Sequence, residues 1–155
     1  MTSKDAESVS QPSSRTLNAL VDYWTSLCRG EAFPRREDLD PVDIPQLLPA
    51  IFLVQVPTAE TEDYVFRLAG EDVCALYGQP LRGKTVSDIL CPEMVDLVRA
   101  QYTEMVKDPR PRFIRFKMLK GQGRYYDCER ALLPFCDDTG RVTVLLGGVA
   151  GVDAE

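Results

Sequence analysis

The sequence contains no histidine among its 155 residues. This absence excludes a serine or cysteine nucleophile activated by histidine, and it excludes a haem held by a histidine ligand. The five cysteines include no Cys-x-x-Cys pair, which argues against an all-cysteine zinc site and against a disulfide framework. We therefore expect no catalytic residue and no metal site, and we expect reduced thiols in a cytoplasmic protein. The sequence does not name a cofactor.

Long apolar runs and an excess of basic charge are also missing. No apolar stretch approaches the roughly 20 residues that a membrane span requires, and residues 1–15 contain no apolar signal-peptide core. The formal net charge is −6, whereas nucleic-acid affinity depends largely on clustered lysine and arginine. The segment 107-KDPRPRFIRFK-117 is locally basic but also has the pattern of a strand. We therefore expect no membrane partner and no nucleic-acid partner.

The sequence that is present divides into three parts. Residues 1–14 are polar and serine-rich, which predicts a disordered tail. In residues 15–30 the apolar side chains recur at intervals of three and four residues, which predicts an amphipathic helix. Its stripe packs on the chain's own domain or on a second copy, and we expect both. The candidates for the contact of a homodimer are Leu17, Leu20, Val21 and Trp24. Residues 31–152 form the main domain.

The hydrophobic period within the main domain changes several times between that of a strand and that of a helix. A proline-rich connector precedes two strands, a glycine-punctuated insert of short helices follows, and one longer helix leads into three final strands. This order predicts an α+β fold, namely a five-stranded antiparallel sheet with the helices on one face and the first and last strands meeting centrally. The predicted strands are 51–56, 64–69, 112–119, 125–133 and 141–152, and the longer helix is 92–107.

Short motifs follow one another along the chain in a definite order. They are Trp24, Pro34-Arg35-Arg36, Leu39-Asp40-Pro41, Leu47-Leu48-Pro49, Arg67-Leu68-Ala69-Gly70, Tyr77-Gly78, Leu81-Arg82-Gly83, Leu132-Leu133-Pro134, Asp138-Thr139-Gly140 and Leu146-Gly147-Gly148. The ordered set, over residues 17–150, resembles a bacterial branch of short stand-alone proteins in the PAS domain family. The resemblance implies a PAS fold and a sensory or interaction role.

One face of the predicted sheet carries the candidates for a ligand pocket. They are Phe116, Met118, Tyr126, Cys128 and Arg130, with Tyr77 approaching from the helical insert. Arg130 is the one charge among them, and an isolated buried cation is costly. It therefore reaches solvent, pairs with Glu71 or Asp72, or meets an anionic ligand. The apolar members are either packed core or the lining of a pocket.

We therefore expect a stand-alone cytoplasmic PAS-like sensory or regulatory domain. It binds a small molecule or a protein partner and signals through dimerisation or partner contact. Cys74 lacks the Asn-Cys-Arg-Phe setting of photosensory relatives, which argues against covalent flavin binding. Two alternatives stay open. One is a ligand-free protein-interaction module, and the other is a small α+β cone enzyme of ketosteroid-isomerase type. The enzyme needs an acid on the concave sheet face, whereas Asp127 and Glu129 are predicted on the polar face of their strand.

Overall fold

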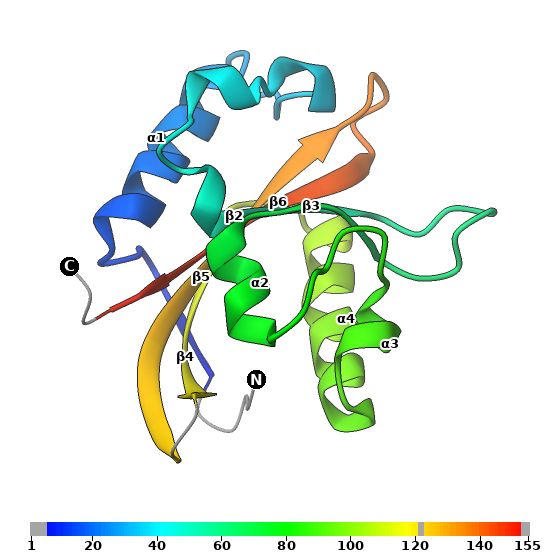
Figure 1. The fold of residues 1–155 in the computed structure, drawn as a ribbon. Helices are drawn as coiled ribbons and strands as arrows, with labels where there is room; N and C mark the ends of the chain where they lie inside the picture. Colours follow the sequence, from blue (N-terminus) through cyan, green and yellow to red (C-terminus); the bar gives the residue numbers. More distant parts are fainter. Residues whose placement is uncertain (1–5, 121–122, 153–155) are drawn as a thin grey trace.

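A six-stranded antiparallel sheet lies between two helical layers in the computed structural model, which describes residues 6–120 and 123–152 (Figure 1). In chain order the elements are β1 (Glu7–Val9), α1 (Arg15–Leu27), three 3-10 helices (Arg36–Asp38, Pro41–Asp43 and Leu48–Ala50), β2 (Ile51–Gln55), β3 (Val65–Ala69), α2 (Glu71–Tyr77), α3 (Val86–Ile89), α4 (Pro92–Lys107), β4 (Arg112–Lys120), β5 (Arg124–Cys136) and β6 (Val142–Gly151).

The strands lie in the order β1-β4-β5-β6-β2-β3. The first and last of the five predicted strands, β2 and β6, pair within the sheet, with Phe52 opposite Gly147. The predicted α+β class and this central pairing are therefore confirmed. The sheet has one strand more than predicted.

The additional strand, β1, corrects the prediction of a disordered tail over residues 1–14. Glu7–Val9 pair with Phe113–Arg115 along the edge of β4. The three residues have no hydrophobic alternation that would identify a strand, and two of them are exposed. Backbone pairing with an otherwise open sheet edge, rather than side-chain burial, accounts for this strand. Residues 1–5 lie outside the described residues.

The inner face of the sheet is covered by α2, α3 and α4. The predicted helix over 92–107 is α4, which has Pro92 at its first position. Its buried side chains are Met94, Val95, Val98, Tyr102 and Met105. They pack with side chains from every long strand into one apolar cluster. This cluster is the main core of the domain.

The outer face of the sheet is covered by α1 and the proline-rich connector, which form a second apolar cluster. Ser14 caps α1 by accepting a hydrogen bond from the Leu17 amide at 3.2 Å. The indole Nε1 of Trp24 donates to the Pro134 carbonyl at 3.0 Å, which ties the helix to β5. The helix ends at Leu27 rather than at Gly30, because Cys28 is already extended and Gly30 lies in the following turn at φ +64°.

Two glycines allow elements to approach more closely than a side chain would permit. A Cβ at Gly70 would lie 2.1 Å from the Leu48 carbonyl oxygen, so this glycine lets the end of β3 contact the connector where α2 begins. A Cβ at Gly148 would lie 2.7 Å from the Leu20 side chain on α1. These close approaches explain two of the glycine motifs found in the sequence.

Candidate functional site

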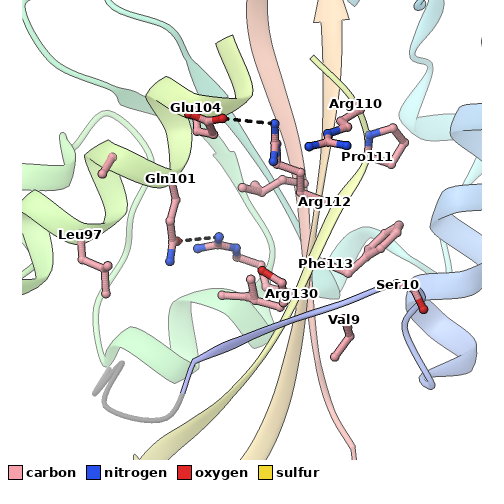
Figure 2. Close-up of a pocket in the computed structure, with 14 residues that line it drawn as sticks. Val9, Ser10, Leu97, Gln101, Glu104, Arg110, Pro111, Arg112, Phe113 and Arg130 are labelled. Atoms are coloured by element: carbon pink, nitrogen blue, oxygen red, sulfur yellow. Dashed lines mark hydrogen bonds and ion pairs between the residues drawn. The ribbon is translucent and has the colours of Figure 1, made fainter. Parts of the chain in front are cut away.

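A pocket of about 590 Å³ lies between α4 and strands β4 and β5, with the β1 segment at its border (Figure 2). Helix α4 contributes Leu97, Gln101 and Glu104, and the β1 segment contributes Val9 and Ser10. The remaining lining comes from Ser8, Ala100, Arg110, Pro111, Arg112, Phe113, Ile114, Arg130 and Leu132. A pocket of this size is within the usual range for small-molecule sites.

Arg130 is the buried charge of this pocket. Strand alternation places it on the inner face of β5, opposite Ile114 and Val149, and it is 5% exposed. Its Nη2 donates to Oε1 of Gln101 at 2.7 Å, as Figure 2 shows. The guanidinium carbon lies 5.9 Å from the centroid of the Tyr102 ring. Arg130 is therefore held by a neutral amide and an aromatic ring.

No acidic side chain among residues 6–120 and 123–152 pairs with Arg130, and its Nε is buried without a hydrogen-bond partner. The predicted pairing with Glu71 or Asp72 is therefore not found. Burial lowers the pKa of Arg130 from its ordinary value, and nearby Tyr102 and Tyr77 partly oppose this shift. The guanidinium of arginine keeps its charge in proteins. The pocket thus contains a desolvated positive charge.

Arg112 forms the rim of the pocket and is more exposed than Arg130. Its Nη2 donates to the Asp108 carbonyl at 2.8 Å and lies 3.2 Å from the Asp108 carboxylate. Glu104 on α4 is farther away, at 3.9 Å (Figure 2). The Nε of Arg112 is also buried without a partner. The positive charge at the rim is therefore partly neutralised, unlike that of Arg130.

Glu129, the residue before Arg130, faces the opposite side of the sheet and is fully buried. Its carboxylate accepts hydrogen bonds from the backbone amides of Ser13 and Ser14 at 2.9 Å and pairs with Arg115 at 3.1 Å. Burial alone would raise the pKa of Glu129, but these hydrogen bonds outweigh burial and hold the pKa below its usual value. Glu129 thereby anchors the start of α1 directly behind the pocket.

The other residues predicted for the ligand pocket lie elsewhere. Phe116, Met118 and Cys128 are at most 3% exposed and belong to the packed inner core. Tyr77 packs half-buried against the same core, and Tyr126 is 40% exposed near the beginning of β5. Only Arg130 of the six lines this pocket. The buried side chains share one face of the sheet, as predicted, and they pack within the main apolar cluster there.

The residues predicted for a dimer contact are used inside the chain. Leu17, Leu20 and Trp24 are at most 5% exposed, and all three lie beneath α1 against its own sheet. Val21 is half-buried. In this conformation the first three have almost no surface left for a second copy, because their packing on the chain itself already removes it from water. Formation of a homodimer stays a prediction.

Sequence reasoning missed Gln101 and the role of Glu129. Gln101 is a polar residue at the four-residue spacing of Leu97 and Met105, and this interruption of an apolar stripe was the available signal. The strand pattern predicts that the Glu129 side chain faces away from the inner face of the sheet, and the structure agrees. The outer face is covered by α1 and the preceding segment, so the carboxylate is buried rather than hydrated.

Other sites expected from the sequence can be placed in the same structure. No group of three or more Cys, Asp or Glu side chains within the described ranges is arranged to hold a metal ion. Cys74 lies on α2, and its Sγ is 3.8 Å from the Ala69 carbonyl oxygen. No helix in the described part of the chain is long and apolar enough to cross a bilayer.

Comparison with known proteins gives one family. A family model described as a PAS domain matches residues 12–150. No curated protein matches the chain in sequence.

Among solved structures, the PAS domain of BvgS from Bordetella pertussis superposes with a TM-score of 0.56 at 18% identity, covering 72% of this chain and 82% of that one. A PAS domain from Colwellia psychrerythraea gives 0.51 at 13% identity, covering 74% and 98%. An RNA-binding light-oxygen-voltage receptor gives 0.55 at 16% identity, covering 97% of this chain but only 39% of the receptor.

The structural likenesses show a common fold, and the family match extends over most of the chain. The predicted resemblance is thereby confirmed: the chain belongs to the PAS family of sensory-type domains.

Proposed function

We propose that this PAS domain is a sensor that binds a small molecule in the pocket between α4 and strands β4 and β5. The observation that carries the proposal is Arg130, which is 5% exposed and donates only to a neutral amide among the described residues. A buried charge without a counter-charge costs folding free energy, so a position needed only for packing favours an aliphatic residue. An arginine beside a cavity is instead typical of a binding site.

The geometry around the pocket supports a route from ligand to signal. Val9 and Ser10 border the pocket, and the segment after them is anchored by Glu129, next to Arg130 on β5. A ligand that favours one position of β5 or of the β1 segment changes how this anchor is held. The start of α1 is thereby coupled to the occupancy of the pocket. We propose that a protein partner or a second copy of the chain reads this change.

Native mass spectrometry of the full chain tests ligand binding directly. The protein is incubated with the low-molecular-weight fraction of a bacterial cell extract and compared with Ala100→Trp, which fills the pocket from an exposed position on α4. Ala19→Trp is the matched control, because Ala19 is exposed on α1 outside the pocket. We expect an added mass on the wild type and the control but not on Ala100→Trp. No added mass, or equal addition to all three, contradicts the proposal.

The packed centre of the inner face supports a second candidate function. Because Phe116, Met118 and Cys128 fill the space beneath α2 with core, a ligand-free interaction module also accounts for the fold. Such a module predicts an unmodified mass in the same experiment. A ketosteroid-isomerase-like enzyme has less support, because the buried carboxylate of β5, Glu129, faces α1 and is occupied by backbone amides.

A further inference from the structure

We infer that the ligand of this pocket is a small organic carboxylate, with its anionic group on Arg130 and its apolar part between α4 and strands β4 and β5. The inference rests on the proposed function, since it names the ligand class for the same pocket. Three features of the pocket carry it: the hydrogen-bonding groups that lack partners, the balance of charge, and the apolar lining.

The buried polar atoms of the pocket that lack a partner are donors. The Nε atoms of Arg130 and Arg112 are both buried without a partner, and both residues line the pocket. The Oε1 of Gln101 already accepts from Arg130, which leaves the Nε2 of this amide as a further donor. An ionised carboxylate is an acceptor only, with two oxygens that match such a set. A hydroxyl or amide ligand brings donors of its own and matches it less well.

The charge of the pocket differs from that of the chain. Its lining contains three arginines against one glutamate, whereas the whole chain has a net charge of −6. Arg110 and Arg112 lie 3.2 Å from the carboxylate of Asp108. Arg130 alone of the three has no carboxylate beside it. One uncompensated positive charge suits a monoanionic group better than the dianion of inorganic phosphate.

The rest of the lining is suited to a hydrocarbon or aromatic group. Leu97, Ile114 and Leu132 line the pocket together with Arg130. Phe113, Pro111 and Val9 are further apolar residues of the lining, and Phe113 pairs with Val9 of β1. Burial of such surface supplies affinity, while a bidentate pair with arginine supplies orientation. The ligand class is therefore a carboxylate with an apolar body rather than a small inorganic anion.

Gln101 is the residue that a carboxylate would replace or supplement at Arg130. Its side chain has the shape of glutamate, and its oxygen already lies 2.7 Å from the guanidinium. Gln101→Glu therefore places a permanent carboxylate on Arg130 with little change in volume. If Arg130 is an unpaired cation that binds an anion, this variant is more stable than the wild type. The new carboxylate then occupies the position of the ligand's carboxylate, so the ligand no longer binds there.

Matched probes test the charge of the ligand. The full chain is titrated at constant ionic strength with 3-phenylpropionate, with the uncharged 3-phenylpropionamide and with inorganic phosphate. The readout is the Nε–H resonance of Arg130 in a ¹⁵N-correlated spectrum, assigned by its loss in Arg130→Lys. We expect the carboxylate to shift this resonance and to bind at least about tenfold more tightly than the amide. Gln101→Glu should raise the melting temperature and abolish the response, while Arg82→Lys, at an exposed position outside the pocket, should change neither.

Each contrary outcome identifies which statement fails. Equal binding of the acid and the amide overturns the carboxylate inference but leaves the pocket as a small-molecule site. A response to phosphate alone overturns it in favour of an inorganic anion. No response to any probe, together with an unchanged or lower melting temperature of Gln101→Glu, also overturns it. The proposed function is judged separately by the added mass and its loss in Ala100→Trp.

Discussion

Glu129 offers a sharp perturbation, because one carboxylate holds the start of α1 against the sheet. Its oxygens accept from the Ser13 amide at 2.9 and 3.0 Å, from the Ser14 amide at 2.9 Å and from Arg115 at 3.1 Å. Glu129→Gln keeps the shape but replaces one oxygen by an NH₂ group that must face a donor. At least one charge-assisted hydrogen bond is then lost and one buried donor is left unpaired.

The size of the effect follows from those contacts. A hydrogen bond to a charged group contributes about 1.5–3 kcal/mol, and breaking a buried pair costs about 3–5 kcal/mol. The side chain of Arg115 is 38% exposed and recovers hydration, which reduces the loss. We therefore expect Glu129→Gln to lower the free energy of unfolding by about 2–3 kcal/mol at pH 7. For a domain of this length that corresponds to a decrease in melting temperature of about 4–12 °C.

The pH dependence distinguishes this explanation from a general packing defect. The folded-state pKa of Glu129 lies below its unfolded value, so its contribution is present above about pH 4.3 and is lost as pH falls through the folded pKa. Glutamine does not titrate. The difference between wild type and Glu129→Gln should therefore be constant from pH 7 to about 5 and should narrow below about pH 4, where Arg115 keeps its charge.

Urea denaturation at a series of pH values is the assay, with Glu62→Gln as the control. Glu62 is exposed, so its replacement by glutamine removes the same charge from the surface rather than from a buried position. The control should match the wild type within about 0.5 kcal/mol. A Glu129→Gln variant as stable as the control, or a deficit that stays the same down to pH 3, would refute the reasoning.

Two further predictions concern the close glycine contact and a second carboxylate. Gly70→Ala should destabilise by about 3 kcal/mol or more, because its Cβ meets the Leu48 carbonyl. Gly148→Ala should cost less, because its new Cβ clashes with the side-chain ends of Leu17 and Leu20 and not with backbone atoms. Equal midpoints of the two variants in urea would contradict this order. Burial would raise the pKa of Asp63, but hydrogen bonds from Arg99 and neighbouring groups hold it well below its usual range. Asp63→Asn should therefore destabilise by about 1–2 kcal/mol at neutral pH, with the deficit narrowing below about pH 4; a deficit unchanged at pH 3 by thermal denaturation would contradict this.

The spacing of apolar residues along the chain was sufficient to predict most of the helices and strands. The helix over 92–107 and the five long strands were recognisable because each buries one continuous face, which leaves a repeat in the sequence. β1 was not recognisable, because Glu7–Val9 are held by backbone pairing with an edge and need no particular side chains. The order of strands required the further argument that β2 and β6 meet.

The site was less predictable, because it depends on which elements face each other. Strand alternation identified Arg130 as a charge on the inner face, but its partner lies 29 positions away on α4. Nothing in the local sequence of β5 indicates that the partner of Arg130 is Gln101 rather than Glu71. In the same way, the apolar stripe of α1 did not reveal whether Leu17 and Leu20 would meet the chain's own Gly148 or a second copy. Both questions are decided by tertiary packing.

The explanation of Arg130 connects stability with function. A residue kept for a ligand is commonly suboptimal for the stability of the free protein. Arg130→Met retains much of the length and packing but removes the buried charge and its unpaired Nε. Replacement of a buried ion by a hydrophobic residue of similar volume is often neutral or stabilising. The variant also loses the hydrogen bond to Gln101 and the cation–π contact with the Tyr102 ring. These losses oppose the gain only partly, because Gln101 is half-buried and can bind water.

The most direct test of a ligand-binding Arg130 is therefore the free energy of unfolding of Arg130→Met in urea. The protein is first unfolded and refolded so that no small molecule remains bound. If Arg130 is retained for a ligand, the variant should be at least as stable as the wild type, with a gain of about 1–2 kcal/mol. A loss of more than about 1 kcal/mol would show that Arg130 stabilises the empty fold, and it would contradict the central claim.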